Sequence, residues 1–216
     1  RLKKQKFKFL HISTDEVFGS LTSNGKFNED TPYSPNSPYS ASKASSDHLV
    51  QAWNKTYNFP TIITNCSNNY GPWQFLEKLI PLTISKSIRG ETIPIYGDGQ
   101  NIRDWLHVED HIDALLKVLN KGSIGETYCI GGFGDRKNIE VVNSICDYLD
   151  EKLPSKNSHS RLIKFIKDRP GHDFRYSIDS TKIKKHLNWI PKITFEEGLK
   201  TTINWYLENI NWLNKV

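Results

Sequence analysis

Short apolar runs that end at polar residues recur along this chain and predict buried β-strands. Between them, apolar residues return at the three- and four-residue spacing of helices that pack one face against a core. The predicted strands cover residues 7–14, 60–66, 92–96 and 126–130, and the predicted helices cover 38–57, 76–89, 108–119, 138–153, 179–187 and 194–212. Their alternation predicts an α/β fold with a parallel sheet.

Polar side chains at three predicted helix starts support these boundaries. Ser37 precedes a proline, a pair typical of an N-cap followed by the first helical residue. Asn138 is placed to cap its helix, and Thr194 with Glu197 forms a capping box. An Asn-, Pro- and Ser-rich loop is expected at 20–37.

Two parts of the chain differ in their patterns. Residues 1–72 and 104–132 contain most of the strand pattern, and we expect them to form the sheet domain. Residues 73–103 and 133–216 are more helical and rich in loops, so we expect a smaller lobe over the open end of the sheet. With 216 residues, of which 37% are hydrophobic, the chain can bury a substantial core.

Composition narrows the class of protein. Much of the net charge of +5 comes from the basic residues near the start, Arg1, Lys3, Lys4, Lys6 and Lys8, which we interpret as a solvated face. No recognition helix or stacking motif indicates nucleic-acid binding. No apolar run reaches the length of a membrane span, and no signal peptide is visible.

The counts of two sulfur-containing residues carry further information. The three widely spaced cysteines fit neither a disulfide framework nor a zinc site, which favours a cytoplasmic location. The 216 residues contain no methionine. We therefore expect the sequence to be part of a longer protein.

An acid pair, Asp15 and Glu16, stands directly after the first predicted strand. Ligands of open α/β sheets bind outside the carboxyl ends of the strands. Paired carboxylates at such a place can divide the roles of general acid and general base. Considered alone, the pair is more simply explained as loop acids that cap the next helix.

Tyr39 and Lys43 stand four residues apart on a predicted helix and therefore share one face. A tyrosine hydroxyl titrates near pH 10, and a nearby ammonium group lowers that pKa toward neutrality. Considered alone, the two residues are more simply explained as a surface pair. Their position after a strand that ends in Ser-Thr-Asp-Glu indicates proton transfer coupled to a nicotinamide cofactor.

Several motifs together resemble the dTDP-glucose 4,6-dehydratase family of the extended short-chain dehydrogenase/reductases. The resemblance covers essentially all 216 residues, and related sugar epimerases usually have small residues where Asp15 and Glu16 stand. It implies the C-terminal part of a Rossmann-like sheet together with a nucleotide-sugar-binding lobe. The matching segments are Ser-Thr-Asp-Glu-Val-Phe-Gly at 13–19, Tyr-x-x-x-Lys at 39–43, and residues 64–72, 77–81, 94–97, 103–111, 128–132 and 168–172.

The resemblance implies an NAD-dependent lyase that converts dTDP-glucose to dTDP-4-keto-6-deoxyglucose and water, on the way to rhamnose or a related deoxysugar. Tyr39 would take the proton from the sugar O4 while NAD takes the hydride from C4, and Thr14 would hydrogen-bond O4. Glu16 would then remove the C5 proton, and Asp15 would protonate the leaving C6 hydroxyl. Lys43 would hold the cofactor ribose, and Asn69 would face the cofactor.

The same matching assigns a set of residues to the nucleotide sugar. Arg103 suits the diphosphate because its guanidinium is permanently charged and bidentate, and Lys78 adds a second positive charge. Backbone N–H groups of the 168–172 segment would serve the base or ribose, and no metal site is expected. The implied substrate-binding residues are Thr14, Asn68, Lys78, Leu79, Pro94, Ile95, Tyr96, Arg103, Asn138, Asp168, Arg169, Pro170, Gly171 and His172.

The Gly-rich fingerprint that binds a dinucleotide pyrophosphate is absent from the sequence. Without the strands that accompany it, the strand at 7–14 would expose an edge and an apolar face. We expect the isolated chain neither to hold NAD tightly nor to turn over. Two alternatives remain open: another sugar-nucleotide dehydratase or epimerase, and a truncated chain that binds a sugar nucleotide without turnover.

The resemblance also implies a homodimer. The 38–57 helix and the helix after Leu76 would pack against their partners in a helical bundle. Leu49, Val50 and Trp53 would serve either this interface or the sheet, and the sequence does not separate these two roles.

Overall fold

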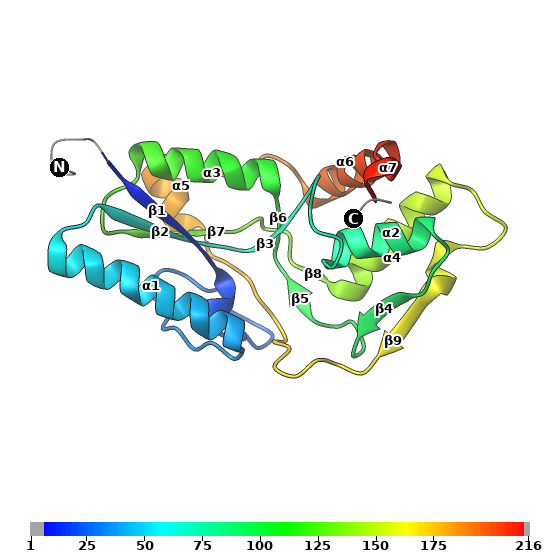
Figure 1. The fold of residues 1–216 in the computed structure, drawn as a ribbon, viewed down its shortest axis with the longest axis horizontal. Helices are drawn as coiled ribbons and strands as arrows, with labels where there is room; N and C mark the ends of the chain where they lie inside the picture. Colours follow the sequence, from blue (N-terminus) through cyan, green and yellow to red (C-terminus); the bar gives the residue numbers. More distant parts are fainter. Residues whose placement is uncertain (1–6, 214–216) are drawn as a thin grey trace.

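The computed structural model describes residues 7–213. Most of the basic run at the start of the sequence, from Arg1 to Lys6, lies outside the described residues. Figure 1 shows an elongated molecule with a sheet and its helices at one end and a second group of helices at the other. The expected α/β class is confirmed.

Three parallel strands form the main sheet in the order β1-β2-β7. They are β1 (Phe9–Thr14), β2 (Thr61–Cys66) and β7 (Thr127–Ile130). The register pairs Thr14 with Cys66 and Cys66 with Ile130, so all three strands end at the same edge. In Figure 1 the sheet lies between α1 (Pro38–Tyr57) on one side and α3 (Val108–Lys121) with α5 (Thr181–Leu187) on the other.

The first strand is less buried than its apolar pattern predicts. Phe9 is 39% exposed and Ile12 is 46% exposed, because β1 is the outer strand and pairs only with β2 among the described residues. The prediction of a buried strand at 7–14 is therefore wrong at β1. The expected exposed edge and apolar face are present in the structure.

Three further pairs of strands lie outside the main sheet. β3 (Asn68–Tyr70) runs parallel to β6 (Trp105–His107), and β5 (Ile102–Arg103) runs antiparallel to β8 (Arg136–Lys137). The predicted strand near 92–96 is β4 (Ile93–Tyr96), which pairs with β9 (Ile163–Ile166). Five of these six strands were not predicted, because each is only two to four residues long and pairs with a distant segment.

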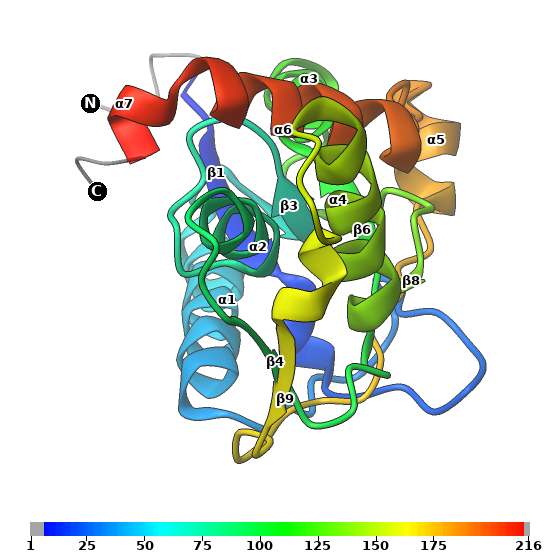
Figure 2. The ribbon, with the colours of Figure 1, turned by 90° about the vertical axis from the view of Figure 1, so that its right-hand side faces the viewer.

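Helices α2 (Leu79–Ile88), α4 (Asn138–Lys152) and α6 (Phe195–Glu208) form the second group. Figure 2 looks onto this group, with α6 across the top and α2 and α4 below it. Their shared core contains Ile84, Ile145, Leu199, Ile203 and Tyr206. The predicted division into two domains stays a prediction, and one segment of the expected lobe packs elsewhere. Ile183, Leu187 and Trp189 join the core between the sheet and α3, beside Ile62 and Tyr128.

The helix starts agree with the capping residues in two of three cases. Ser37 Oγ accepts from Ser40 N at 3.1 Å, and Thr194 Oγ1 accepts from Glu197 N at 3.3 Å, so both predicted caps are confirmed. Asn138 is wrong as a cap, since it is already the first residue of α4.

Three other helix boundaries differ from the prediction. The helix expected at 194–212 breaks at Asn209, after which a short helix, α7 (Ile210–Leu213), begins. The helix expected from residue 179 begins at Thr181, because Asp179 Oδ1 accepts from Thr181 N at 2.8 Å before the helix starts. Helix α2 also begins three residues later than expected, after a turn at 76–78.

Candidate active site

The end of β1 delivers the acid pair to the edge where the three parallel strands stop. A 3-10 turn (Asp15–Phe18) follows the strand directly. Thr14 organises it: Thr14 Oγ1 accepts from Glu16 N at 3.2 Å and donates to Asp15 Oδ1 at 3.3 Å. Gly19 ends the turn with φ +86°, and a Cβ there would lie 2.4 Å from the Ser34 carbonyl oxygen, so the turn requires glycine.

The two carboxyl groups of the pair lie in different surroundings. Asp15 is 2% exposed, and burial, assisted by the charges of Glu16 and Asp104, raises its pKa well above its usual range. Its Oδ2 has no hydrogen-bond partner among the described residues. Asp15 therefore favours its protonated form, which suits a general acid.

Glu16 faces the cavities of the site instead. Partial burial raises its pKa, while the positive charges of Arg169 and Arg103 oppose that rise by stabilising the carboxylate. A carboxyl group that is partly desolvated and stabilised as the carboxylate by nearby positive charge suits a general base. The environments of Asp15 and Glu16 thus separate an acid from a base, as in other paired-carboxylate sites.

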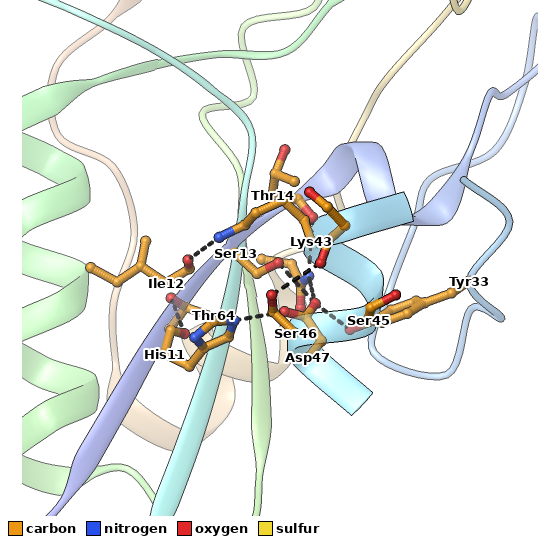
Figure 3. Close-up of polar contacts among 12 residues, drawn as sticks. His11, Ile12, Ser13, Thr14, Tyr33, Lys43, Ser45, Ser46, Asp47 and Thr64 are labelled. Carbon is orange, nitrogen blue, oxygen red and sulfur yellow. Dashed lines mark hydrogen bonds and ion pairs between the residues drawn. The ribbon is translucent and has the colours of Figure 1, made fainter. Parts of the chain in front are cut away.

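Helix α1 places Tyr39 beside the acid pair, but Lys43 does not act on its pKa as predicted. Burial and the negative charge of Glu16 raise the pKa of Tyr39. The Lys43 ammonium group donates instead to the Ile12 carbonyl oxygen at 2.9 Å (Figure 3). The prediction that Lys43 lowers the pKa of Tyr39 is therefore wrong for this arrangement, because a strand carbonyl holds the ammonium.

A buried carboxylate that the sequence did not single out joins β1, β2 and α1. Asp47 Oδ2 accepts from Ser13 Oγ at 2.8 Å and from Tyr33 OH at 2.9 Å. Its Oδ1 lies 2.9 Å from His11 Nε2 (Figure 3), and Asn65 Nδ2 adds a contact at 3.3 Å. These hydrogen bonds outweigh the effect of burial and lower the pKa of Asp47.

Two adjoining cavities, of about 400 and 450 Å³, share Glu16, Lys78 and Arg169 in their walls. The smaller cavity brings Tyr39 together with Glu16 and the Arg169–Gly171 segment. The larger cavity gathers most of the predicted substrate residues, together with Asn69. Its predicted lining residues are Asn68, Lys78, Leu79, Pro94, Ile95, Tyr96, Arg103, Asn138, Arg169 and His172. Thr14, Asp15, Lys43 and Asp168 line neither cavity.

Arg103 is 4% exposed and is held from behind by backbone carbonyl oxygens. Its Nη1 donates to the Ile102 and Phe174 oxygens at 2.7 and 3.3 Å, and its Nη2 donates to the Asp173 oxygen at 2.8 Å. The guanidinium stacks on the Tyr176 ring at 4.3 Å from its centre. Since a guanidinium has five N–H donors, two remain for a ligand in the cavity.

The 168–172 segment is held by its own side chains. Asp168 Oδ1 accepts from Arg169 N at 2.8 Å and lies 2.7 Å from His172 Nδ1. Burial lowers the pKa of His172, so the ring is neutral at physiological pH and carries no positive charge into the cavity. Arg169 therefore supplies the positive charge of this segment.

The larger cavity also has walls that sequence reasoning missed, namely Gln74, Glu77, Leu82 and Trp105. Three buried polar atoms in its walls have no partner among the described residues: Asn68 Oδ1, Gln74 Oε1 and Trp105 Nε1. Unpaired buried polar atoms are uncommon in folded proteins, and these three can each bind a group that enters the cavity. Glu77 and Trp105 stood inside matched segments and were available to the sequence; Tyr176 beneath Arg103 had no such signal.

Neither a membrane-spanning helix nor a metal-ligand cluster occurs in residues 7–213. None of the helices there is both long and apolar enough to cross a bilayer. No group of three or more His, Cys, Asp or Glu side chains in this part of the chain is arranged to hold a metal ion.

The Rossmann-like sheet, with a site at the carboxyl ends of its strands, places the chain in the structural class of the solved dTDP-glucose 4,6-dehydratases and UDP-glucuronic acid 4-epimerases. Residues 1–202 match the family described as GDP-mannose 4,6 dehydratase, and the chain belongs to that family. It is 55% identical to a dTDP-glucose 4,6-dehydratase of Xanthomonas campestris pv. campestris, over 99% of this chain and 62% of that protein. The chain therefore spans about three-fifths of the length of the curated relatives it matches.

Solved structures show the same likeness. A dTDP-glucose 4,6-dehydratase of Bacillus anthracis, in complex with NAD, has a TM-score of 0.89 at 49% identity, covering 96% of this chain and 64% of that one. A dTDP-glucose 4,6-dehydratase of Streptomyces venezuelae, with NAD and TYD bound, has a TM-score of 0.90 at 43% identity, covering 95% of this chain and 61% of that one. The predicted resemblance to this family is confirmed.

Proposed function

We propose that this chain carries the acid–base residues and the nucleotide-sugar site of an NAD-dependent dTDP-glucose 4,6-dehydratase. One observation carries the proposal most directly: the buried, proton-favouring Asp15 and the cavity-facing Glu16 are adjacent on one strand-end turn, and Tyr39 lies in the same cavity as Glu16. Elimination of water needs an acid and a base on neighbouring atoms of one substrate. Adjacent residues in unlike surroundings supply both.

The described residues fit one end of a nicotinamide cofactor. Tyr39 is 55% exposed at the carboxyl edge of the sheet, and Lys43 places an ammonium group between this helix and β1. Asn69 lies on β3, shortly after β2 ends, in the wall of the larger cavity. When bound, NAD would supply a reversible hydride carrier, which takes hydride from the sugar C4 and returns it to C6. Tyr39, Lys43 and Asn69 would hold its nicotinamide end.

Each catalytic side chain then has a defined task. Tyr39 exchanges the proton of the sugar O4, which Thr14 orients through its hydroxyl. Glu16 removes the C5 proton once a 4-keto group has acidified it. Asp15 gives its proton to the C6 hydroxyl, which leaves as water. The hydrogen bond from Thr14 Oγ1 to Asp15 Oδ1 supports the role of Asp15 as the acid. It occupies Oδ1 and leaves Oδ2, which has no partner among the described residues, to carry the proton.

The positive charges of the cavity support a nucleoside diphosphate sugar as substrate. The two remaining donors of Arg103 can bind a phosphate in the fork geometry that guanidinium favours, and Arg169 and Lys78 add charge to the shared wall. The other predicted lining residues, from Pro94 to His172, complete the same cavity. We propose dTDP as the nucleotide on the 55% identity to dTDP-glucose 4,6-dehydratases.

The test uses two preparations, the 216-residue chain and the complete gene product that contains it. Each is incubated with NAD and dTDP-glucose, GDP-mannose or UDP-glucose, and products are analysed by mass spectrometry. We expect loss of one water from dTDP-glucose with the complete product, and neither tight NAD binding nor turnover with the 216 residues alone. Turnover only of another nucleotide sugar, or epimerisation without loss of water, would refute the proposed function.

We also propose a homodimer formed through α1. Leu49, Trp53 and Tyr57 are 62%, 54% and 64% exposed, and they recur at helical spacing along one face. These residues therefore do not pack on the sheet, which leaves the interface as the favoured role for Leu49 and Trp53. Light scattering of the complete gene product should give a dimer, and Leu49→Arg should shift it toward the monomer; a monomeric wild type would exclude this interface.

A further inference from the structure

We propose that Asp47 is a positioning residue, which fixes the acid pair at the end of β1 relative to Tyr39 on α1. The inference rests on the proposed function. Dehydration needs Glu16 and Tyr39 to reach neighbouring atoms of one sugar, although they belong to different elements that approach each other at the strand edge. Some contact must therefore set the distance between the strand end and the helix.

The strand side of this contact is short and direct. Ser13, which donates to Asp47 Oδ2 at 2.8 Å, immediately precedes Thr14. Asn65 Nδ2 binds Asp47 Oδ2 at 3.3 Å and the Thr14 carbonyl oxygen at 3.0 Å. Two of the groups on Asp47 thus act within two residues of Asp15, where a small displacement would move both carboxyl groups of the pair.

The helix side is equally direct. Asp47 lies one turn after Lys43 and two turns after Tyr39, and residues at this spacing share one face of a helix. The bond from the Lys43 ammonium to the Ile12 carbonyl oxygen makes a second connection between α1 and β1 (Figure 3). A helix fixed at two points along its length has little freedom to slide or rotate against the strand.

A simpler role for Asp47 would be to stabilise the fold. The free-energy cost of burying its carboxylate argues against that role. Its side chain is fully buried, and a buried carboxylate is costly unless several donors satisfy it. Four side chains do so, from β1, β2 and the 20–37 loop: His11, Ser13, Tyr33 and Asn65. Packing alone would be served as well by an apolar residue, whereas a directional set of hydrogen bonds specifies one position of the strand end.

The chain offers a matched control. Asp110 is 3% exposed and accepts from Lys192 N and Ile193 N at 3.0 and 2.8 Å. None of these three residues lines the two cavities that contain Glu16. Asp110→Ala should therefore destabilise the fold, as Asp47→Ala does, without displacing the acid pair.

The experiment measures kcat, KM for dTDP-glucose and thermal stability of the complete gene product as wild type, Asp47→Ala, Asp47→Asn and Asp110→Ala. We expect Asp47→Ala to lower kcat per folded site by about 10²-fold, the scale of a misplacement near 1 Å, with KM changed less than threefold. Asp47→Asn should recover most of kcat, since its oxygen can keep the three bonds of Oδ2 while its amide donates to His11. Asp110→Ala should lower stability and leave kcat within about twofold.

Several results would overturn the inference. These are an unchanged kcat per folded site in Asp47→Ala, an equal fall of kcat in Asp110→Ala, or no recovery in Asp47→Asn. If Asp47→Ala does not fold, Tyr33→Phe removes a single donor to Asp47. It should then lower kcat several-fold with KM unchanged, and an unaltered kcat would reject the role. A wild type that does not dehydrate dTDP-glucose would refute the proposed function instead, so the two failures are distinguishable.

Discussion

Asp104, a buried acid whose charge helps to raise the pKa of Asp15, gives a quantitative prediction. It is 1% exposed and accepts from Gly132 N at 3.0 Å and from Gly134 N at 2.9 Å. Burial raises its pKa from the usual 3.8 to about 6, although the two glycine N–H groups oppose the rise. The folded protein therefore holds a proton on Asp104 at pH values where the unfolded chain has lost it.

The sign and size of the effect on stability follow from this difference. A carboxyl group with a raised folded pKa contributes most below the pKa of the unfolded chain, and that contribution is lost as pH rises from about 4 to about 6. One pKa unit corresponds to about 1.4 kcal/mol, so the difference amounts to about 3 kcal/mol. Asp104→Asn removes this dependence, and its amide disturbs the contact with Gly132 at a cost of about 1 kcal/mol.

We therefore expect Asp104→Asn to be less stable than wild type by about 1 kcal/mol below pH 4 and more stable by about 2 kcal/mol at pH 7. Urea unfolding between pH 3.5 and pH 7.5 measures both free energies. Ile178→Val serves as the control, since it removes one buried methylene near Gly131 and should cost about 1 kcal/mol at every pH. A difference between wild type and Asp104→Asn that stays constant across this range would refute the reasoning.

Three further predictions concern the complete gene product. Glu16→Gln should lower kcat by about 10²–10⁴-fold in a steady-state assay, because the general base is lost; full activity would contradict that role. The acid limb of kcat/KM against pH should lie above pH 4.5, because burial raises the pKa of Glu16 and the base must be ionised; a limb at or below pH 4.5 would show that another group limits the rate. Arg103→Lys should weaken dTDP binding about tenfold or more by calorimetry, since an ammonium cannot keep the carbonyl contacts and also offer a fork to phosphate, and equal affinity would exclude the diphosphate contact.

The sequence predicted secondary-structure boundaries well where neighbouring residues alone determine the backbone conformation. Helix α1 begins and ends as predicted, because Ser37 and the following proline fix its start through backbone geometry alone. The strand-end position of Asp15 and Glu16 was also available, since an apolar run that stops at acids marks the end of a buried or half-buried strand. Apart from Thr14, thirteen residues were predicted to bind the substrate, and ten of them line the larger cavity. They could be predicted because they lie in or near the motifs that match the family.

Other features needed the tertiary structure, because they depend on groups that are distant in sequence. Strand β9 forms only because β4 lies beside it, some 70 residues earlier. The pKa of Tyr39 is raised, whereas the prediction had it lowered by Lys43. The Lys43 ammonium group donates to the Ile12 carbonyl oxygen instead, a contact that helical spacing cannot reveal.

The sequence by itself determined the chemistry that is present: an adjacent acid pair at a strand end, a helical Tyr-x-x-x-Lys, and permanent positive charge in a matched segment. The tertiary structure decided how that chemistry is divided. Burial and neighbouring charge, which no local pattern encodes, raise the pKa of Asp15, and the packing around the turn leaves Glu16 in the cavity wall. The role of Asp47 emerged in the same way, since its four partners come together only when β1, β2, α1 and the 20–37 loop have packed.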